Sequence, residues 1–248
     1  MKTWGRALRN FVFVSILLGV QVTAHAGMQE DMVKFDQVYI PALSLSNQGK
    51  PQTAAAMDRL LETWSWFKQS YAYSNSGDSQ WNFDMTQIEN QLMEAQRLIE
   101  RKAYPDAHEA LESVRFTLMG MRERIGMAYF IDELIRFHQP MEDIALKAKA
   151  AAKAGLSDAD IDAIKQDYLQ AREKWDVVLN WNFNPYDYGM DIAQGEKLHK
   201  QLMLEDQALR QLGQALAGSD RKAIAQAAAG IKPPFVPCYL SFGRFPST

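Results

Sequence analysis

Cysteine is almost absent, because the chain of 248 residues contains a single one, Cys238. One cysteine cannot form an intramolecular disulfide, so the stability of the fold must come from packing. It also excludes the paired-cysteine haem attachment motif and the usual cysteine zinc sites. Cys238 stands between Pro237 and Tyr239 in an apolar stretch, and we predict a buried thiol rather than a reactive one.

Catalytic signatures are also missing. The sequence has no Gly-x-Ser-x-Gly, no phosphate-binding glycine loop and no dinucleotide fingerprint. The neighbouring acids Glu205 and Asp206 point apart on a helix and predict solvated charge. A Glu-x-x-His motif occurs once, at Glu196 and His199, whereas a di-iron bundle needs two copies and two further carboxylates. We therefore predict that the protein is not an enzyme.

A long apolar run lies near the N-terminus, over residues 11–20. Three basic residues, Lys2, Arg6 and Arg9, precede it, and the small-x-small pattern Ala24-His25-Ala26 follows it. These are the three regions of a secretory signal peptide, and the run is shorter than the roughly 20 residues that span a bilayer. We predict cleavage before Gly27.

Cleavage would remove residues 1–26 and leave residues 27–248 as the mature protein. The removed segment carries three basic residues and no acidic one, so the formal charge falls from −3 (27 − 30) to −6 (24 − 30). A mildly acidic protein is a poor partner for nucleic acid or an anionic membrane. Later apolar stretches are interrupted by charges, so no second membrane segment is expected. We predict a periplasmic or secreted protein.

Apolar residues recur at three- and four-residue steps through most of the mature chain, which is typical of amphipathic helices. No stretch alternates apolar and polar residues as a strand does. We predict an all-α fold, an antiparallel helical bundle of consecutive helical hairpins in a single domain over residues 27–248. Asp84 and the Ser157/Asp160 pair are the expected N-terminal caps, Pro41 is expected to weaken or end the first helix, and Pro140 is expected to kink its helix.

The C-terminal segment, residues 231–243, contains three prolines and is not expected to form a regular helix. It is also strongly apolar, so we predict that this Pro-rich tail docks across the bundle through Phe235, Tyr239, Leu240 and Phe242. With the segments at residues 104–111 and 137–142, the tail resembles uncharacterised exported helical-bundle proteins of bacteria. The resemblance implies no known activity.

Histidine, methionine and carboxylate come together in the middle of the chain and suggest a metal site. His138, Met141 and Glu142 share one helical face, and an antiparallel hairpin about Gly126 would bring His108 within about 8 Å along the axis. Such ligands suit copper or another late transition metal in an oxidising compartment. The alternative is ordinary packing of His138 and Met141 with a solvated His108.

Two aromatic clusters offer a second hypothesis. One cluster includes Trp64 and Trp81, and the other includes Trp181 and Tyr186. They could line a pocket for an apolar or planar ligand, haem included, or form a partner surface. The alternative is that they fill the ends of the bundle.

These patterns favour a non-enzymatic periplasmic binding protein, for a metal ion such as copper, for haem or for another small ligand. The alternative function is a structural or adaptor protein that binds other envelope proteins through its helical hairpins.

Overall fold

The computed structural model describes residues 27–75, 78–151 and 155–246, and their regular structure is helical throughout, without a strand. The predicted signal peptide lies outside the described residues. A first helix covers residues 27–46. The elements that follow are α2 (Gln52–Tyr71), α3 (Ser79–Glu100), α4 (Tyr104–Arg124), α5 (Phe130–Ala150), α6 (Asp158–Asn180), η1 (Pro185–Tyr188), α7 (Ile192–Ala217), α8 (Arg221–Ala229) and α9 (Lys232–Leu240). The all-α prediction is confirmed.

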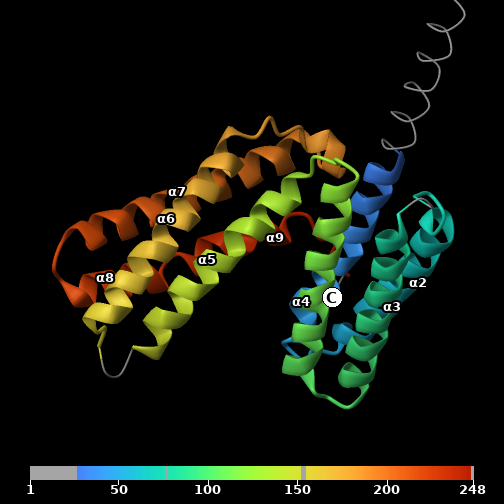
Figure 1. Cartoon of the computed structure of the whole chain (residues 1–248), viewed down its shortest axis with the longest axis horizontal. Coiled ribbons are helices and arrows are strands. Elements are labelled where there is room, and N and C mark those ends of the chain that lie inside the picture. Colours follow the sequence, from blue (N-terminus) through green and yellow to red (C-terminus); the bar gives the residue numbers. More distant parts are fainter. Residues whose placement is uncertain (1–26, 76–77, 152–154, 247–248) are drawn as a thin grey trace, which may run out of the picture.

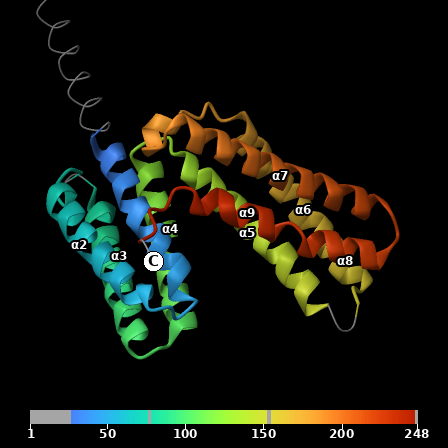
Figure 2. The same ribbon diagram turned by 180° about the vertical axis from the view of Figure 1, so that it is seen from behind.

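The helices form two lobes that spread apart like a V (Figure 1). The N-terminal lobe contains residues 27–46 and helices α2 to α4, and the C-terminal lobe contains α5 to α9. Neighbouring helices pair, α3 with α4 and α5 with α6, while α9 packs against both α7 and α5, as the view from behind also shows (Figure 2). Buried side chains of the two lobes belong to one continuous core. None of the described helices has the length and apolar character needed to cross a membrane.

Side-chain caps fix where several helices begin. The predicted capping box at Ser157 and Asp160 is confirmed, since each side chain bonds the other residue's backbone N–H. The predicted cap at Asp84 is wrong, because α3 starts at Ser79 and Asp78 accepts from the backbone N–H of Gln80. Asp84 instead lies inside α3, where its buried carboxylate pairs with Arg124 of α4. Its charge therefore joins two helices rather than ending one.

Two predictions about proline need correction, whereas the kink at Pro140 stays a prediction, with that residue inside the continuous helix α5. The first helix does not end at Pro41 but continues to residue 46. The segment 231–243 is not irregular, because residues 232–240 form α9. Its first two prolines occupy the opening turn, where backbone N–H groups have no intrahelical acceptor. The missing N–H groups of these prolines therefore remove no hydrogen bond from the helix. The predicted docking is seen: Phe235, Tyr239 and Phe242 are buried, and Leu240 is partly buried against the core.

A buried polar cluster joins the lobes where residues 27–46, α4 and α5 meet. Arg122 of α4 pairs through two nitrogens with Asp132 of α5, and both side chains are almost fully buried. The Arg122 guanidinium lies 4.4 Å from the ring centroid of Tyr129, whose hydroxyl donates to Asp36 at 2.7 Å. Burial raises the pKa of Asp36 to about 6. The cluster fixes the point of the V, from which α4 and α5 diverge (Figure 1).

Candidate functional site

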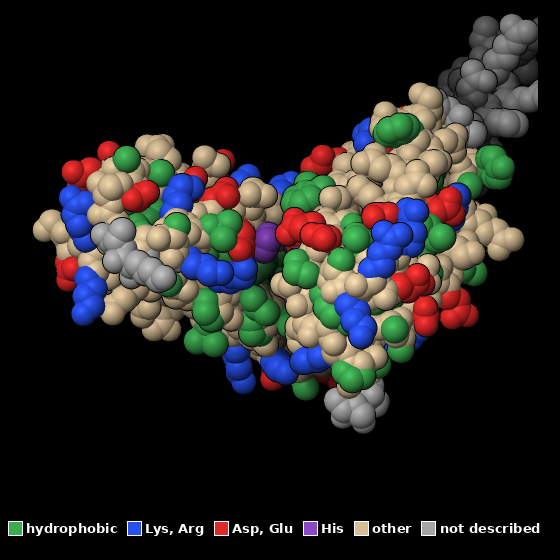
Figure 3. Space-filling model, turned by 90° about the horizontal axis from the view of Figure 1, so that it is seen from below, with side chains coloured by type: hydrophobic (Ala, Val, Ile, Leu, Met, Phe, Trp, Pro, Cys, Tyr) green, Lys and Arg blue, Asp and Glu red, His purple; other side chains and the backbone are tan. Residues whose placement is uncertain are grey.

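A cavity of about 260 Å³ lies between the two lobes. The space-filling view shows this surface hollowed between two masses, with a histidine side chain in the hollow (Figure 3). The C-terminal lobe contributes His138 of α5 and one side of α9, and the N-terminal lobe contributes one side of α4 and the end of the first helix. The lining consists of Ile40, Leu43, Ser44, Asn47, Gln48, His108, Glu112, Arg115, His138, Lys232, Phe235, Val236, Tyr239 and Leu240. We call this cavity the interlobe cleft.

His138 is held by Arg115 across the cleft. The Nη2 atom of Arg115 lies 2.9 Å from Nδ1 of His138. A guanidinium can only donate, so Nδ1 accepts, and the neutral imidazole carries its proton on Nε2. Burial, reinforced by the positive charge of Arg115, lowers the pKa of His138 to about 3. The Nε2–H group lies 3.8 Å from Glu142, beyond hydrogen-bond length, so this donor is free for a ligand.

His108 reaches the same cleft from α4. Its Nδ1 atom lies 3.0 Å from the carbonyl oxygen of Leu43 and 3.2 Å from the hydroxyl of Ser46. The carbonyl can only accept, so Nδ1 carries the proton. Its Nε2 atom lies 3.5 Å from the carboxylate of Glu112. The His108 ring is thereby fixed within the N-terminal lobe, whereas the hydrogen bond from Arg115 to His138 crosses between the lobes.

Charges around the cleft form two opposed pairs. Arg115 pairs with Glu112 on α4, and Lys232 of α9 pairs with Glu142 of α5 at 2.6 Å. Arg115 is almost fully buried, and its Nε atom has no hydrogen-bond partner within the described chain. The side chain of Lys232 is 45% exposed, and those of Glu142 and Glu112 are 22% and 18% exposed, so solvent reaches one cation and both carboxylates. The lining itself presents the cations Arg115 and Lys232 and the carboxylate of Glu112, and the charges balance when Glu142, which pairs with Lys232 from outside the lining, is included.

The four residues of the predicted metal site are only partly brought together. His108 and His138 line the cleft, whereas Met141 is fully buried and Glu142 is engaged by Lys232. Both ring nitrogens of His138 are accounted for, one by Arg115 and one by its own proton. No group of three or more histidine, cysteine or acidic side chains in the described ranges is arranged to hold a metal ion.

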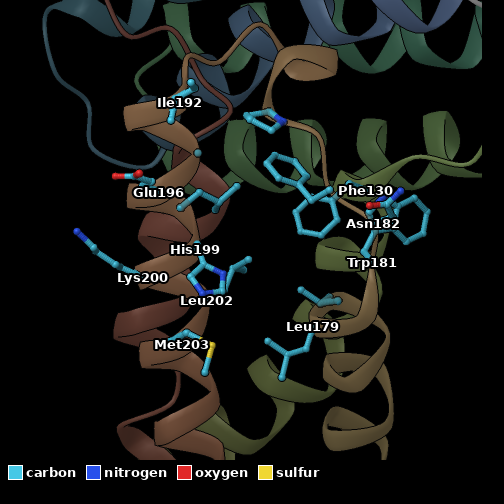
Figure 4. A pocket seen from close by; sticks show the side chains of 15 residues that line it. Phe130, Leu179, Trp181, Asn182, Ile192, Glu196, His199, Lys200, Leu202 and Met203 are labelled. Atoms are coloured by element: carbon cyan, nitrogen blue, oxygen red, sulfur yellow. The ribbon is translucent and has the colours of Figure 1, made fainter.

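The aromatic residues of the predicted pocket separate into different surroundings. Trp64 and Trp81 are buried in the core of the N-terminal lobe. Tyr186, on η1, is 64% exposed and lines none of the cavities described in this section. Trp181 lines a larger cavity of about 730 Å³ between the end of α6 and the start of α7 (Figure 4). We call it the α6–α7 cavity.

Several cleft residues were missed by the sequence analysis, and one had a visible signal. Arg115 lies four residues after Leu111, on the buried stripe of α4, where a charge needs a partner. Glu112 and Tyr239 had no such signal, and Lys232 was read only as part of a tail. Glu205 and Asp206, predicted as solvated, are both buried. Arg172 and Arg210 neutralise Asp206, while Glu205 has no hydrogen-bond partner within the described residues.

No protein-family model matches the chain, and neither a curated protein nor a solved structure matches it. The geometry of the described residues is therefore the basis for the functional argument.

Proposed function

We propose that the protein is an exported, non-enzymatic binding protein whose interlobe cleft holds a small zwitterionic ligand with an apolar side chain, of the amino-acid class. The observation that carries this proposal is the charge balance of the cleft, where Arg115 and Glu112 form one pair and Lys232 and Glu142 form another. A ligand with net charge would leave one group of these pairs uncompensated in a partly buried site, which is costly. A zwitterion adds no net charge.

Each end of such a ligand finds a partner. The free Nε2–H of His138 and the ammonium of Lys232 donate to a carboxylate from the side of the C-terminal lobe. The carboxylate of Glu112 accepts from an ammonium on the other side. Charge-assisted hydrogen bonds of this kind are stronger than neutral ones and fix orientation.

The rest of the lining is apolar and suits an aliphatic or aromatic side chain. Leu43, Phe235 and Leu240 are among its members, and Phe235 packs against the ring of His138 with 5.7 Å between centroids. A volume of about 260 Å³ is below the range of about 300–1,000 Å³ usual for drug-sized ligands, so the ligand must be small.

A metal ion is the less favourable occupant. A cation at His138 would have to displace the Arg115 guanidinium or remove the Nε2 proton, and it would face two positive side chains. His108 alone retains an unprotonated nitrogen toward the cleft, and one imidazole is a weak site.

Isothermal titration with blocked and unblocked amino acids tests the proposal. L-leucine, L-methionine and L-phenylalanine form the test panel, with N-acetyl-L-leucine lacking the ammonium and L-leucinamide lacking the carboxylate. We expect at least one free amino acid to bind, and each blocked form of leucine to bind about tenfold or more weakly, as for loss of one hydrogen-bonded charge. No binding by any free amino acid, or equal binding by blocked and free leucine, would overturn the proposal.

Matched variants assign the binding to the cleft. Lys232→Met removes the exposed cation of the cleft, and Lys222→Met removes an exposed cation of α8 outside it. We expect only Lys232→Met to weaken amino-acid binding. A parallel titration compares copper(II) binding by the parent protein and by His138→Ala. If the parent binds copper, the variant does not, and no amino acid binds, the ligand of the cleft is a metal ion and not a zwitterion.

A further inference from the structure

The α6–α7 cavity has walls of two kinds. Trp181, in the segment after α6, stands on one side with Phe130 of α5, and the α7 side chains Leu202 and Met203 stand on the other (Figure 4). Phe183 and Leu198 also line the cavity. The aromatic side is a packed group, since the ring centroid of Phe130 lies 4.8 Å from that of Phe183 and 6.1 Å from that of Trp181. The cavity is thus a slot between an aromatic wall and an aliphatic wall.

Apolar side chains at the mouth of this slot remain exposed to solvent. Ile192 is 62% exposed and Met203 is 41% exposed, and both line the cavity. They are about 16 Å apart along α7, from the rise of 1.5 Å per residue. Because both side chains border the cavity, a ligand in the slot would cover apolar surface at each end of its mouth.

One polar side chain of α7, that of the exposed residue His199, points toward the cavity. His199 points from α7 toward the opposite wall, whereas Glu196 and Lys200 project from the outer side of the helix (Figure 4). Asn182 offers an amide on the aromatic side. The imidazole and the amide provide directed hydrogen bonds between largely apolar walls, so the occupant needs a hydrogen-bonding group and an apolar body.

We infer that the α6–α7 cavity is a second binding site, which takes a planar aromatic carboxylate. The flat body lies against the Trp181 wall, where ring stacking adds to the burial of apolar area. The thioether of Met203 faces it from the other wall, and sulfur favours the edge of an aromatic ring. The carboxylate accepts from the imidazole N–H of His199, which points toward the opposite wall.

The volume separates this ligand from the one proposed for the interlobe cleft. The α6–α7 cavity is about 730 Å³ and the cleft about 260 Å³, and their linings share no residue. Binding at one site can therefore be tested without the other. This inference does not rest on the function proposed for the cleft.

Titration calorimetry with 2-naphthoate tests the inference, with decanoate as an aliphatic acid and 2-naphthamide as an aromatic molecule without the charge. We expect 2-naphthoate to bind, and the other two to bind about tenfold or more weakly, since one loses the stacking and the other loses the charge-assisted hydrogen bond. Decanoate binding as tightly as 2-naphthoate, or no binding of 2-naphthoate, would overturn it.

Two pairs of variants locate the site. His199→Ala is compared with Lys197→Ala, an exposed residue of α7 outside the cavity, and Trp181→Leu is compared with Trp66→Leu, a half-exposed tryptophan of α2. We expect only the first member of each pair to weaken 2-naphthoate binding. Circular dichroism confirms that all four variants remain helical. Loss of 2-naphthoate binding in Lys232→Met, with full binding in His199→Ala, would place the ligand in the interlobe cleft and refute this site.

Discussion

The guanidinium of Arg115 donates to Nδ1 of His138 across 2.9 Å, so that α4 of one lobe fixes the tautomer of an imidazole on α5 of the other. A buried cation beside a histidine disfavours its protonation. This hydrogen bond determines what the interlobe cleft can bind, because it leaves His138 neutral and able to donate to a ligand through Nε2.

The first prediction concerns the protonation of His138. Burial, with the charge of Arg115 as the next cause, lowers its pKa to about 3. Histidine-selected nitrogen NMR across a pH series should show an Nε2-protonated ring that stays neutral at about pH 5, and Arg115→Met should raise this pKa while Lys222→Met leaves it unchanged. A ring that titrates in the parent near its ordinary value of 6.5 would contradict the geometry.

The free energy of unfolding should also depend on pH through His138. The folded-state pKa of His138 is depressed, so the unfolded chain binds more protons between about pH 6.5 and 3. The contribution to stability is present above about pH 6.5 and is lost as the pH falls toward 3. His138→Gln should flatten this part of the pH profile of the unfolding free energy.

The second prediction concerns Glu205, whose carboxylate is buried on α7 without a hydrogen-bond partner in the described residues. Burial raises its pKa to about 9, so the folded state retains a proton that the unfolded chain releases near its ordinary value of 4.5. Stability is therefore fully present below about pH 4.5 and falls as the pH rises toward 9. Glu205→Met should stabilise the protein by about 2–4 kcal/mol at about pH 8, and by much less at about pH 4.5.

Thermal or urea unfolding at the two pH values measures this difference. Glu196→Met, at an exposed position of the same helix, is the control and should show no such pH dependence. If Glu205→Met is destabilising at about pH 8, the carboxylate has a stabilising partner and the account of its burial is wrong.

The sequence predicted the helices better than it predicted the sites. Apolar residues at helical spacing mark the buried stripes of α3 and α7, because burial along one face is a local property of the sequence. The prediction that residues 232–240 are not a regular helix was wrong because it considered the number of prolines and not their positions. Two of the three lie in the first turn, where proline is tolerated. The register of a helix can be predicted from one segment, whereas its end depends on a few side-chain caps.

The cleft could be predicted only in part. His108 and His138 share it, as a hairpin about Gly126 suggested, but Lys232 comes from α9, ninety residues beyond its partner Glu142. No local pattern links such residues, because their contact depends on how the two lobes pack. Arg115 could have been predicted as a buried and paired residue, because a charged residue on the buried stripe of a helix needs a polar partner.

The third prediction concerns the buried ion pair at the point of the V. Replacing Asp132 by Asn leaves Arg122 charged, buried and without its carboxylate, which should cost about 3–5 kcal/mol. The exposed pair between Glu30 and Lys34 provides the control, where Glu30→Gln should change stability by less than about 0.5 kcal/mol. Urea denaturation measures both free energies of unfolding, and equal effects would show that burial does not govern the pair.

The fourth prediction compares two glycines inside helices. A Cβ atom at Gly120 of α4 would meet only the flexible end of Arg124 at 3.5 Å, so Gly120→Ala should stabilise the protein by about 0.5–1 kcal/mol through helix propensity. A Cβ atom at Gly213 of α7 would lie 2.9 Å from the Cζ atom of Tyr168 on α6. That contact is too short, so α6 and α7 would have to separate or the ring would have to move. Gly213→Ala should therefore destabilise the protein by about 1–3 kcal/mol despite the same gain in propensity.

Thermal unfolding of both variants checks the opposite signs. Gly213→Ala combined with Tyr168→Ala should recover part of the propensity gain, because the steric conflict is then absent. Stabilisation by Gly213→Ala alone would mean that α6 and α7 are not packed as closely as the structure places them.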